Sequence, residues 1–145
     1  APGKIEIQEI DCLVAGPAEV VIEIQHAGVC GTDLTIFRGE YPISLPHVCG
    51  HEFTGKVKSV GNGVSKDWIG KNVTAEINNT CIAYSKIQLC AFCKKGLPSH
   101  CLTRTVTGII NHEGAFADEV KVAAGTLHEI PANIDPLIGV IIFAS

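Results

Sequence analysis

Residues 51–63 read His-Glu-Phe-Thr-Gly-Lys-Val-Lys-Ser-Val-Gly-Asn-Gly, in which polar and apolar side chains alternate up to a glycine-rich turn. Alternation with a period of two is the signature of a half-buried β-strand. Gly61-Asn62-Gly63 is typical of a tight turn. The stretch therefore predicts a strand over residues 51–60 that ends in a sharp turn.

The same alternation recurs on both sides of this stretch. It predicts further strands at residues 4–10, 20–25, 72–77, 105–110, 115–122 and 127–130. Only residues 33–38 and the C-terminal segment have a helical pattern, and Asp135 followed by Pro136 is typical of the N-cap and first position of a helix. Seven or so short strands predict a mainly β domain, either a barrel or a sandwich, with short helices.

The composition agrees with one folded domain. Of the 145 residues, 46% are hydrophobic and 18% are charged, which excludes a disordered chain, and the length fits one domain rather than two. The apolar segment after Pro136 runs to Ser145 without a helix stop signal, and the sequence has no Met. We therefore expect residues 135–145 to begin a helix of a longer protein.

Charge and hydropathy exclude two classes of partner. The net charge of −4 and the isoelectric point of 5.8 provide no basic field for nucleic acid or anionic lipid. The longest apolar run, residues 137–144, is far shorter than the ~20 residues that span a bilayer. Since no secretion signal opens the sequence either, we expect a cytoplasmic protein that binds neither nucleic acid nor membrane.

Residues 78–102, called the cysteine lobe below, break the β pattern. They hold four of the seven cysteines, namely Cys81, Cys90, Cys93 and Cys101. Two thiolates separated by two residues wrap one zinc ion closely, and four thiolates complete its tetrahedral shell. The spacing predicts a structural zinc site, with His100 as an alternative to Cys101 as the last ligand. Disulfides, a redox-active Cys-x-x-Cys and unrelated buried thiols are the competing interpretations.

A second candidate site lies at Cys30 and His51. Cys30 stands in a glycine-bounded turn, residues 28–33, before a short helix. One thiolate and one neutral imidazole leave a divalent ion with a charge of about +1, so that it stays a strong Lewis acid. A metal-bound His usually donates its other N–H to a carboxylate, and Asp33 and Glu52 are the candidates. From residue types alone, a small buried Cys and a hydrogen-bonded polar His explain these positions equally well.

Several short motifs follow one another along the chain: Gly28-Val29-Cys30-Gly31-Thr32-Asp33-Leu34, Gly39, Pro42, Pro46, Gly50-His51-Glu52-Phe53-Thr54-Gly55, Val60-Gly61 and Gly114-Ala115-Phe116-Ala117-Asp118. In this order they resemble the zinc-dependent medium-chain alcohol dehydrogenases, in particular their N-terminal catalytic domain, over nearly the whole chain. The resemblance implies a GroES-like fold over residues 1–145, a partly open β-barrel with short helices and a four-cysteine structural zinc lobe.

The resemblance also implies roles for individual residues. A catalytic zinc is expected on Cys30 and His51, with Asp33 and Glu52 supporting these ligands and the Thr32 hydroxyl bonded to the substrate oxygen. Glu52 is also a candidate third ligand of the zinc.

Three departures from the family pattern affect this expectation. A relay His commonly follows the Thr by three residues, where this chain has Thr35, so the proton is expected to leave through water or another group. The spacing from Cys81 to Cys90 is longer than usual, which makes Cys81 the least secure lobe ligand. The family's third zinc ligand is absent from residues 137–145, where Phe143 stands near its place.

The expected activity is the reversible oxidation of an alcohol or polyol, with hydride passed to NAD or NADP. The chain has no Gly-x-Gly-x-x-Gly at a strand-to-helix turn, so cofactor binding is expected outside it and the chain alone is expected to be inactive. The intact parent protein is expected to be a homo-oligomer. Two alternatives stay open: a stand-alone zinc-binding GroES-like module used for interaction or assembly, and a zinc-free reductase relative, against which Cys30, His51 and the lobe cysteines argue.

Overall fold

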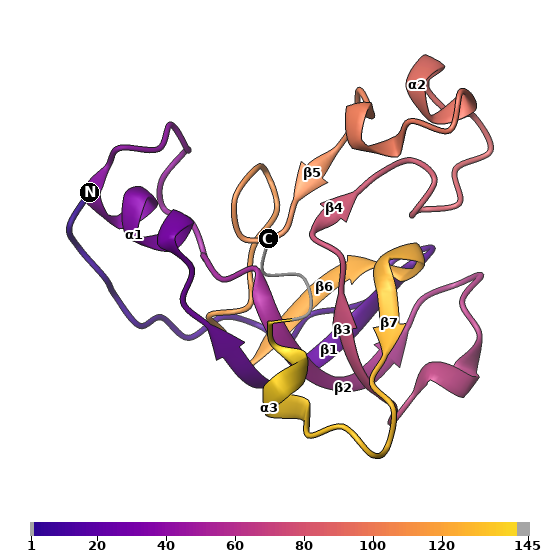
Figure 1. Ribbon diagram of the computed structural model, residues 1–145, viewed down its shortest axis with the longest axis horizontal. Helices are drawn as coiled ribbons and strands as arrows, with labels where there is room; N and C mark the ends of the chain where they lie inside the picture. The colour runs from indigo at the N-terminus through magenta and orange to yellow at the C-terminus, as the bar shows by residue number, and fades with distance from the viewer. Residues whose placement is uncertain (1, 142–145) are drawn as a thin grey trace.

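The computed structural model describes residues 2–141 and is built on one antiparallel sheet of five strands (Figure 1). The strand order is β6-β1-β2-β3-β7. The strands are β1 (Glu19–Gly28), β2 (Glu52–Val60), β3 (Asn72–Ala75), β6 (Glu119–Ala123) and β7 (Leu127–Glu129). A mainly β domain, as the alternation predicts, is therefore confirmed.

The sheet is open but strongly curled. β6 and β7 form its two edges, yet only residues 124–126, the η3 turn (Ala124–Thr126), separate them in the sequence. On a flat sheet the two edges would lie about 19 Å apart, because neighbouring strands are about 4.8 Å apart. Four chain steps reach at most about 14 Å. The sheet must therefore bend until its edges approach each other, without closing into a barrel.

The concave side of this sheet holds the main core. Phe53 is 1% exposed, and it packs with aliphatic side chains from all five strands. The members are Val20, Ile22, Phe53, Val57, Val73, Ala75, Ala115, Val120, Val122 and Leu127. Gly55 lets β1 and β2 approach at an irregularity in their register, since a Cβ there would lie 2.2 Å from the carbonyl oxygen of Glu23.

Short helices and a second, two-stranded sheet surround this core. α1 (Gly31–Arg38) follows β1, η1 (Lys66–Trp68) precedes β3, and α3 (Pro136–Gly139) follows β7. As predicted, Asp135 caps α3 by accepting from the amide of Leu137 (2.9 Å). β4 (Asn78–Asn79), at the start of the cysteine lobe, pairs with β5 (Thr105–Val106), which follows the lobe.

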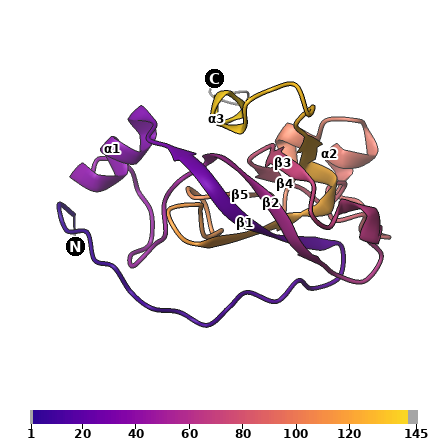
Figure 2. The ribbon, with the colours of Figure 1, turned by 90° about the horizontal axis from the view of Figure 1, so that it is seen from below.

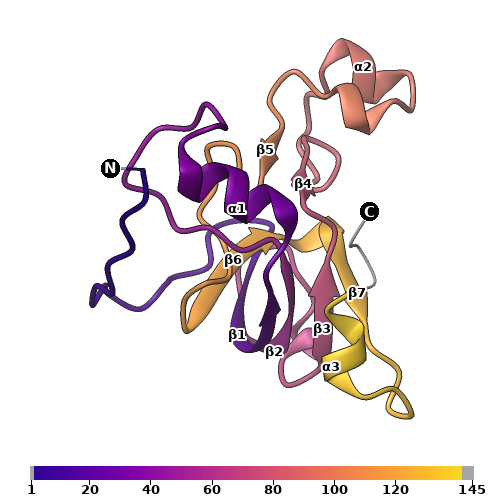
Figure 3. The same cartoon turned by 60° about the vertical axis from the view of Figure 1, so that its left-hand side comes forward.

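The cysteine lobe projects away from the five-stranded sheet (Figures 1 and 3). It contains α2 (Ala91–Lys94) and η2 (Pro98–His100). Among the described residues, no helix is long and apolar enough to cross a membrane.

Three predicted strands are wrong in whole or in part. Residues 4–10 form no strand: they run along the outside of the molecule (Figure 2), where Ile7 is 100% exposed. Residues 105–110 double back, because the amide of Val106 bonds the carbonyl of Ile110, so β5 has two residues. Residues 115–118 instead pack on the loop before β2, where the amide of Ala115 bonds the carbonyl of Gly50.

A buried amide joins the two sheets. The Asn79 side chain is fully buried, and its Nδ2 donates to Thr107 Oγ1 (2.8 Å) and to the carbonyl of Ile77 (3.3 Å). Its Oδ1 accepts from the amide of Ala123 on β6 (2.8 Å). Asn79 therefore fixes the base of the cysteine lobe to an edge strand of the main sheet.

We predict that Asn79→Ala destabilises the chain by about 2–4 kcal/mol, because a buried amide and a buried hydroxyl lose their partners. The measurement is the free energy of unfolding in urea. Asn62→Ala, at an exposed turn, is the matched control and should change stability by less than about 0.5 kcal/mol. Equal losses in the two variants would show that Asn79 does not join the sheets.

Candidate metal centres

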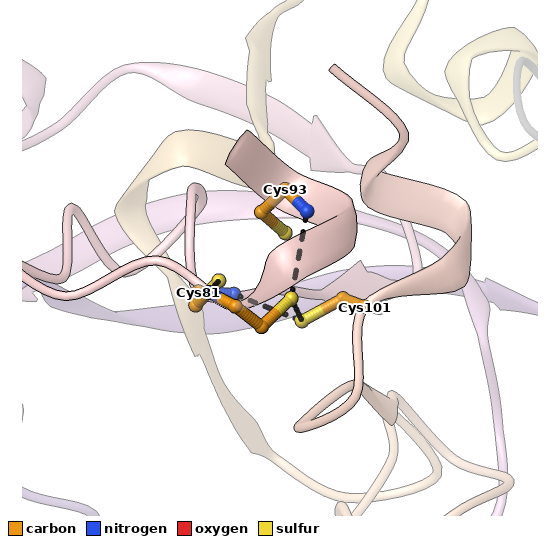
Figure 4. Close-up of side chains that lie close together, drawn as sticks. Cys81, Cys93 and Cys101 are labelled. Atoms are coloured by element: carbon orange, nitrogen blue, oxygen red, sulfur yellow. Dashed lines mark hydrogen bonds between the residues drawn. The ribbon is translucent and has the colours of Figure 1, made fainter. Parts of the chain in front are cut away.

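The four lobe cysteines converge on one point. Their Sγ atoms all lie within 4.8 Å of one another, and Figure 4 shows Cys81, Cys93 and Cys101 turned toward a common centre. Cys90 is the N-cap of α2 and Cys93 lies one turn later, so the first turn of this helix places both sulfurs on one side. Cys81 follows β4, and Cys101 follows η2.

Backbone amides point at three of these sulfurs. The amide of Cys81 donates to Sγ of Cys101 (3.4 Å), that of Cys90 to Sγ of Cys81 (3.5 Å), and that of Cys93 to Sγ of Cys90 (3.5 Å). The Thr103 hydroxyl lies 3.6 Å from Sγ of Cys101, a contact that the sequence analysis did not anticipate. Donors placed in this way stabilise thiolates rather than thiols.

Ionisation of the cluster is uneven. The amide of Cys93, followed by that of Leu102, lowers the pKa of Cys90 to about 6. Burial and the neighbouring sulfurs raise the pKa of Cys93 to about 12. Without a cation, the Cys90 thiolate forms readily, whereas burial and the neighbouring sulfurs oppose the ionisation of Cys93. A bound cation removes this opposition, because it favours every thiolate at once.

The donor set fits a tetrahedral zinc ion. With Zn–S bonds of about 2.3 Å, sulfurs at the corners of a tetrahedron lie about 3.8 Å apart. The Sγ atoms of Cys90 and Cys101 are 3.9 Å apart. All seven cysteines of the chain are free thiols, so no disulfide competes for these sulfurs. His100 is not among the four converging residues, and its ring instead lies 5.9 Å from that of Phe92.

A second group of ligand-type side chains lies at the end of the β1–β2 ladder. Cys30, His51 and Glu52 offer a sulfur, a ring nitrogen and a carboxylate oxygen within 4.8 Å of one another. The register explains the meeting, because Gly28 at the end of β1 pairs with Glu52 at the start of β2. Cys30 lies two residues beyond Gly28, and His51 one residue before Glu52.

Asp33 orients this group from the first turn of α1. Its carboxylate is 6% exposed and accepts from the amides of Cys30 (2.8 Å) and Gly50 (3.3 Å). The same carboxylate lies 3.5 Å from Nδ1 of His51, a buried nitrogen without another partner among the described residues. Asp33 therefore connects the turn that carries Cys30 to the turn that carries His51. It faces Nδ1 of the imidazole, which leaves Nε2 free for a ligand.

The ionised forms of Asp33, His51 and Cys30 stabilise one another. Asp33 is the main cause that raises the pKa of His51 to about 9. Burial opposes the ionisation of Asp33, but His51 and the two amides hold its pKa below its usual value. The amide of Thr32, with a smaller effect of His51, lowers the pKa of Cys30. A thiolate beside an imidazole that a carboxylate orients is a donor set that suits zinc.

Two threonines, Thr32 and Thr35, follow Cys30 on α1. Sγ of Cys30 lies 3.8 Å from the Thr32 hydroxyl. The Thr35 hydroxyl donates to the backbone carbonyl of Thr32 (2.8 Å), within the same turn of helix. Thr35 is thus tied to its own helix.

Glycine permits the tight approach of chain around His51. Gly50 has φ 95°, a left-handed conformation that disfavours residues with a side chain. A Cβ at Gly50 would lie 2.8 Å from the backbone nitrogen of Phe116. The loop that precedes β6 therefore packs directly on the turn that carries His51.

The C-terminal part of the described chain covers the same end of the ladder. A Cβ on Gly28 would lie 2.9 Å from Val140 and 3.0 Å from Oε2 of Glu52, so Val140 packs against Gly28 at the end of the ladder where Glu52 lies. Phe143, which stands near the family's third-ligand position, lies outside the described residues.

Comparison with known proteins agrees with these features. The family model of the alcohol dehydrogenase GroES-like domain matches residues 16–132. The chain is 33% identical to a sorbitol dehydrogenase of Halalkalibacterium halodurans and 36% identical to an L-threonine 3-dehydrogenase of Bacillus subtilis. The matches cover 92% and 93% of this chain, and 37% of each relative.

Solved structures give the same result. A short chain alcohol dehydrogenase of Escherichia coli, complexed with NADH, superposes with a TM-score of 0.85 at 30% identity over 97% of this chain and 39% of its own. A protein of Sinorhizobium meliloti described as a zinc-binding dehydrogenase, bound to NADP, gives a TM-score of 0.82 at 30% identity, with coverage of 97% and 39%.

These matches establish the family. The chain belongs to the alcohol dehydrogenases through their GroES-like domain, as the motifs predict. It spans about 37% of the length of the curated relatives that it matches.

We predict that Asp33→Ala destabilises the metal-free chain by about 2–4 kcal/mol, because the buried amide of Gly50 and the partly buried amide of Cys30 lose a charged acceptor. Urea unfolding in the presence of a chelator measures this loss apart from any effect of metal. Glu40→Ala, just beyond α1 and exposed, is the control and should stay within about 0.5 kcal/mol of the parent. An Asp33→Ala chain as stable as the control would exclude a bridging role for this carboxylate.

Proposed function

We propose that this chain is the catalytic domain of a zinc-dependent dehydrogenase that oxidises an alcohol or polyol and passes hydride to NAD or NADP. The observation that carries the proposal is the meeting of Cys30, His51 and Glu52 beside the buried carboxylate of Asp33. The names of the relatives, a sorbitol and an L-threonine dehydrogenase, support a small hydroxylated substrate.

In this proposal, Cys30 and His51 hold a catalytic zinc ion, and Glu52 is the third protein ligand that this chain offers. The ion, when bound, polarises the substrate oxygen as a Lewis acid. Cys30 and His51 alone leave a net charge of about +1, whereas coordination by Glu52 reduces it to about zero and weakens that acidity. Glu52 is therefore best suited to hold the ion when no substrate is present.

The other residues act on the ligands and on the proton. The Asp33 carboxylate faces Nδ1 of His51, so the proton stays on that nitrogen and the orientation of the ring is fixed. The Thr32 hydroxyl, 3.8 Å from Sγ of Cys30, accepts the proton of the substrate hydroxyl group. Thr35 stands at the position where the family commonly has a relay histidine, which would receive the proton next. The Thr35 hydroxyl is instead bonded to the backbone of α1, so the proton passes to water.

The cysteine lobe has a separate role. We assign a structural zinc ion to Cys81, Cys90, Cys93 and Cys101, including Cys81 despite its long spacing from Cys90. Four thiolates on one ion leave about −2 charges, which removes its Lewis acidity and closes the shell to substrate. Since the buried cluster of the lobe consists of three of these cysteines, the metal stabilises the lobe in place of an apolar core.

The nicotinamide cofactor is assigned to a part of the whole protein outside this chain. No Gly-x-Gly-x-x-Gly motif occurs in the 145 residues, and the two similar structures with NADH or NADP are longer than the chain. We further propose a homo-oligomeric parent protein. We place it in the cytoplasm, because seven free thiols suit a reducing compartment.

A second candidate function is a zinc-binding interaction module without catalysis. One observation favours it: the four-cysteine cluster is complete within the chain and needs no substrate site. Such a module has no use for a thiol, an imidazole and a carboxylate converging at the other end of the sheet. Substitution of Cys30 separates the two functions.

We predict one tightly held zinc ion in the lobe. Cys101→Ser should release about one zinc per chain, because three thiolates do not close the shell, whereas Cys12→Ser, at an exposed thiol, should release none. Metal analysis and thiol titration check this, and in the loaded chain the four lobe thiols should react far more slowly than the others. Equal reactivity of all seven thiols in the loaded chain would exclude the lobe site.

We predict that Cys30→Ala removes the second, weaker zinc and leaves the lobe zinc in place. In the full-length enzyme, kcat/KM for the alcohol should fall by about 10³-fold or more, since the Lewis acid contributes several kcal/mol. Cys12→Ala is the control and should keep both zinc content and activity. If Cys30→Ala keeps its second zinc and its activity, Cys30 is not a ligand and the interaction module is the better explanation.

A further inference from the structure

Two carboxylates hold the turn that leads into His51, and only one of them lies beside its imidazole. Residues 47–50, called the His51 turn below, bond Asp33 through the amide of Gly50 (3.3 Å). The amide of Val48 donates instead to Oε2 of Glu113 (2.6 Å). The His51 turn is therefore held by two carboxylates that come from distant parts of the sequence.

The residues after Glu113 continue this contact along the turn. Three of their amides donate to carbonyls of the turn: Gly114 to Val48 (2.7 Å), Ala115 to Gly50 (2.8 Å) and Phe116 to Cys49 (2.9 Å). The approach is close, because a Cβ on Gly114 would lie 2.4 Å from the carbonyl oxygen of Cys49. The position of the His51 turn therefore follows the position of residues 113–116, and Glu113 adds a side-chain contact to this row of backbone bonds.

A buried imidazole at the start of the turn also depends on Glu113. The His47 side chain is 7% exposed, and its Nδ1 lies 3.5 Å from Oε2 of Glu113. The Nε2 atom of His47 is buried and has no hydrogen-bond partner among the described residues. Without Glu113, the ring would lose the carboxylate beside it and would gain free energy by reaching water. Since the ring belongs to the His51 turn, such a movement displaces the turn.

The effect of Glu113 is local rather than global. Its side chain is 67% exposed, so water screens its charge and its contribution to the stability of the whole chain is small. Its two contacts, however, are with Val48 and His47, which lie three and four residues before His51. A small loss of global stability with a large change at His51 is therefore the expected pattern.

We propose that Glu113 is a positioning residue of the candidate zinc centre, which fixes the His51 turn so that His51 meets Cys30 and Glu52. This proposal rests on the proposed function. Asp33 sets the orientation of the imidazole, whereas Glu113 sets the place of the backbone that carries it. Partners that orient metal ligands typically contribute about 10–100-fold to metal affinity. Because Glu113 acts through the backbone, we expect an effect of about tenfold, at the lower end of that range.

The zinc affinity of the second site tests the proposal, by competition with a chromophoric chelator in the chain with a loaded cysteine lobe. Glu113→Ala should weaken this site about tenfold and leave the lobe zinc in place. Glu113→Gln keeps an oxygen acceptor for the Val48 amide and should retain most of the affinity. Glu129→Ala, which removes a half-exposed carboxylate paired with Lys71, is the matched control and should bind zinc like the parent.

Amide hydrogen exchange of the metal-free chain gives a second readout, which does not depend on zinc. In Glu113→Ala the Val48 amide loses its acceptor and should exchange faster. Because the turn moves as a unit, the Gly50 amide, whose acceptor is Asp33, should also exchange about tenfold faster. Acceleration confined to Val48, or an unchanged zinc affinity, would overturn the proposal. An equal loss of affinity in Glu129→Ala would do the same, since the effect would then be one of general stability.

The same zinc titration separates this proposal from the proposed function. If Cys30→Ala keeps the second zinc, or if the parent chain binds none, the proposed function fails, and hydrogen exchange alone then decides whether Glu113 positions the turn. If Cys30→Ala loses the second zinc and Glu113→Ala keeps it at the affinity of the parent, only the positioning role of Glu113 fails. Circular dichroism verifies that each variant is folded.

Discussion

The antiparallel pairing of β1 with β2 positions nearly everything else in this domain. It runs from Val20 opposite Val60 to Gly28 opposite Glu52, and it brings together two turns that lie about twenty residues apart in the sequence. At the same end, the carboxylate of Asp33 accepts from the amides of Cys30 and Gly50 and faces His51. A slip of one residue would turn every side chain of β2 to the opposite face and separate Glu52 from Cys30.

The two candidate metal centres gather their side chains by different physical means. Cys30, His51 and Glu52 come together because the sheet register and a buried carboxylate hold their backbones, so the site is preorganised by the main core. The lobe has no such core: its buried cluster consists of Cys81, Cys93 and Cys101. Backbone amide donors, the pairing of β4 with β5 and the Asn79 anchor position the lobe before a cation binds. With the proposed zinc ions in place, the lobe would draw its stability from the metal, whereas the group of Cys30, His51 and Glu52 is held by the sheet.

Much of this arrangement follows from local sequence patterns. Alternation identifies β2 correctly, Asp135 and Pro136 mark the start of α3, and the cysteine spacing identifies the converging group in the lobe. The same alternation wrongly predicts a strand at residues 4–10. A strand also needs a neighbouring strand to pair its backbone hydrogen bonds, and the pattern of the segment alone does not show whether such a neighbour is present. The Asn79 anchor was missed for a related reason, since its partners Thr107 and Ala123 are distant in sequence.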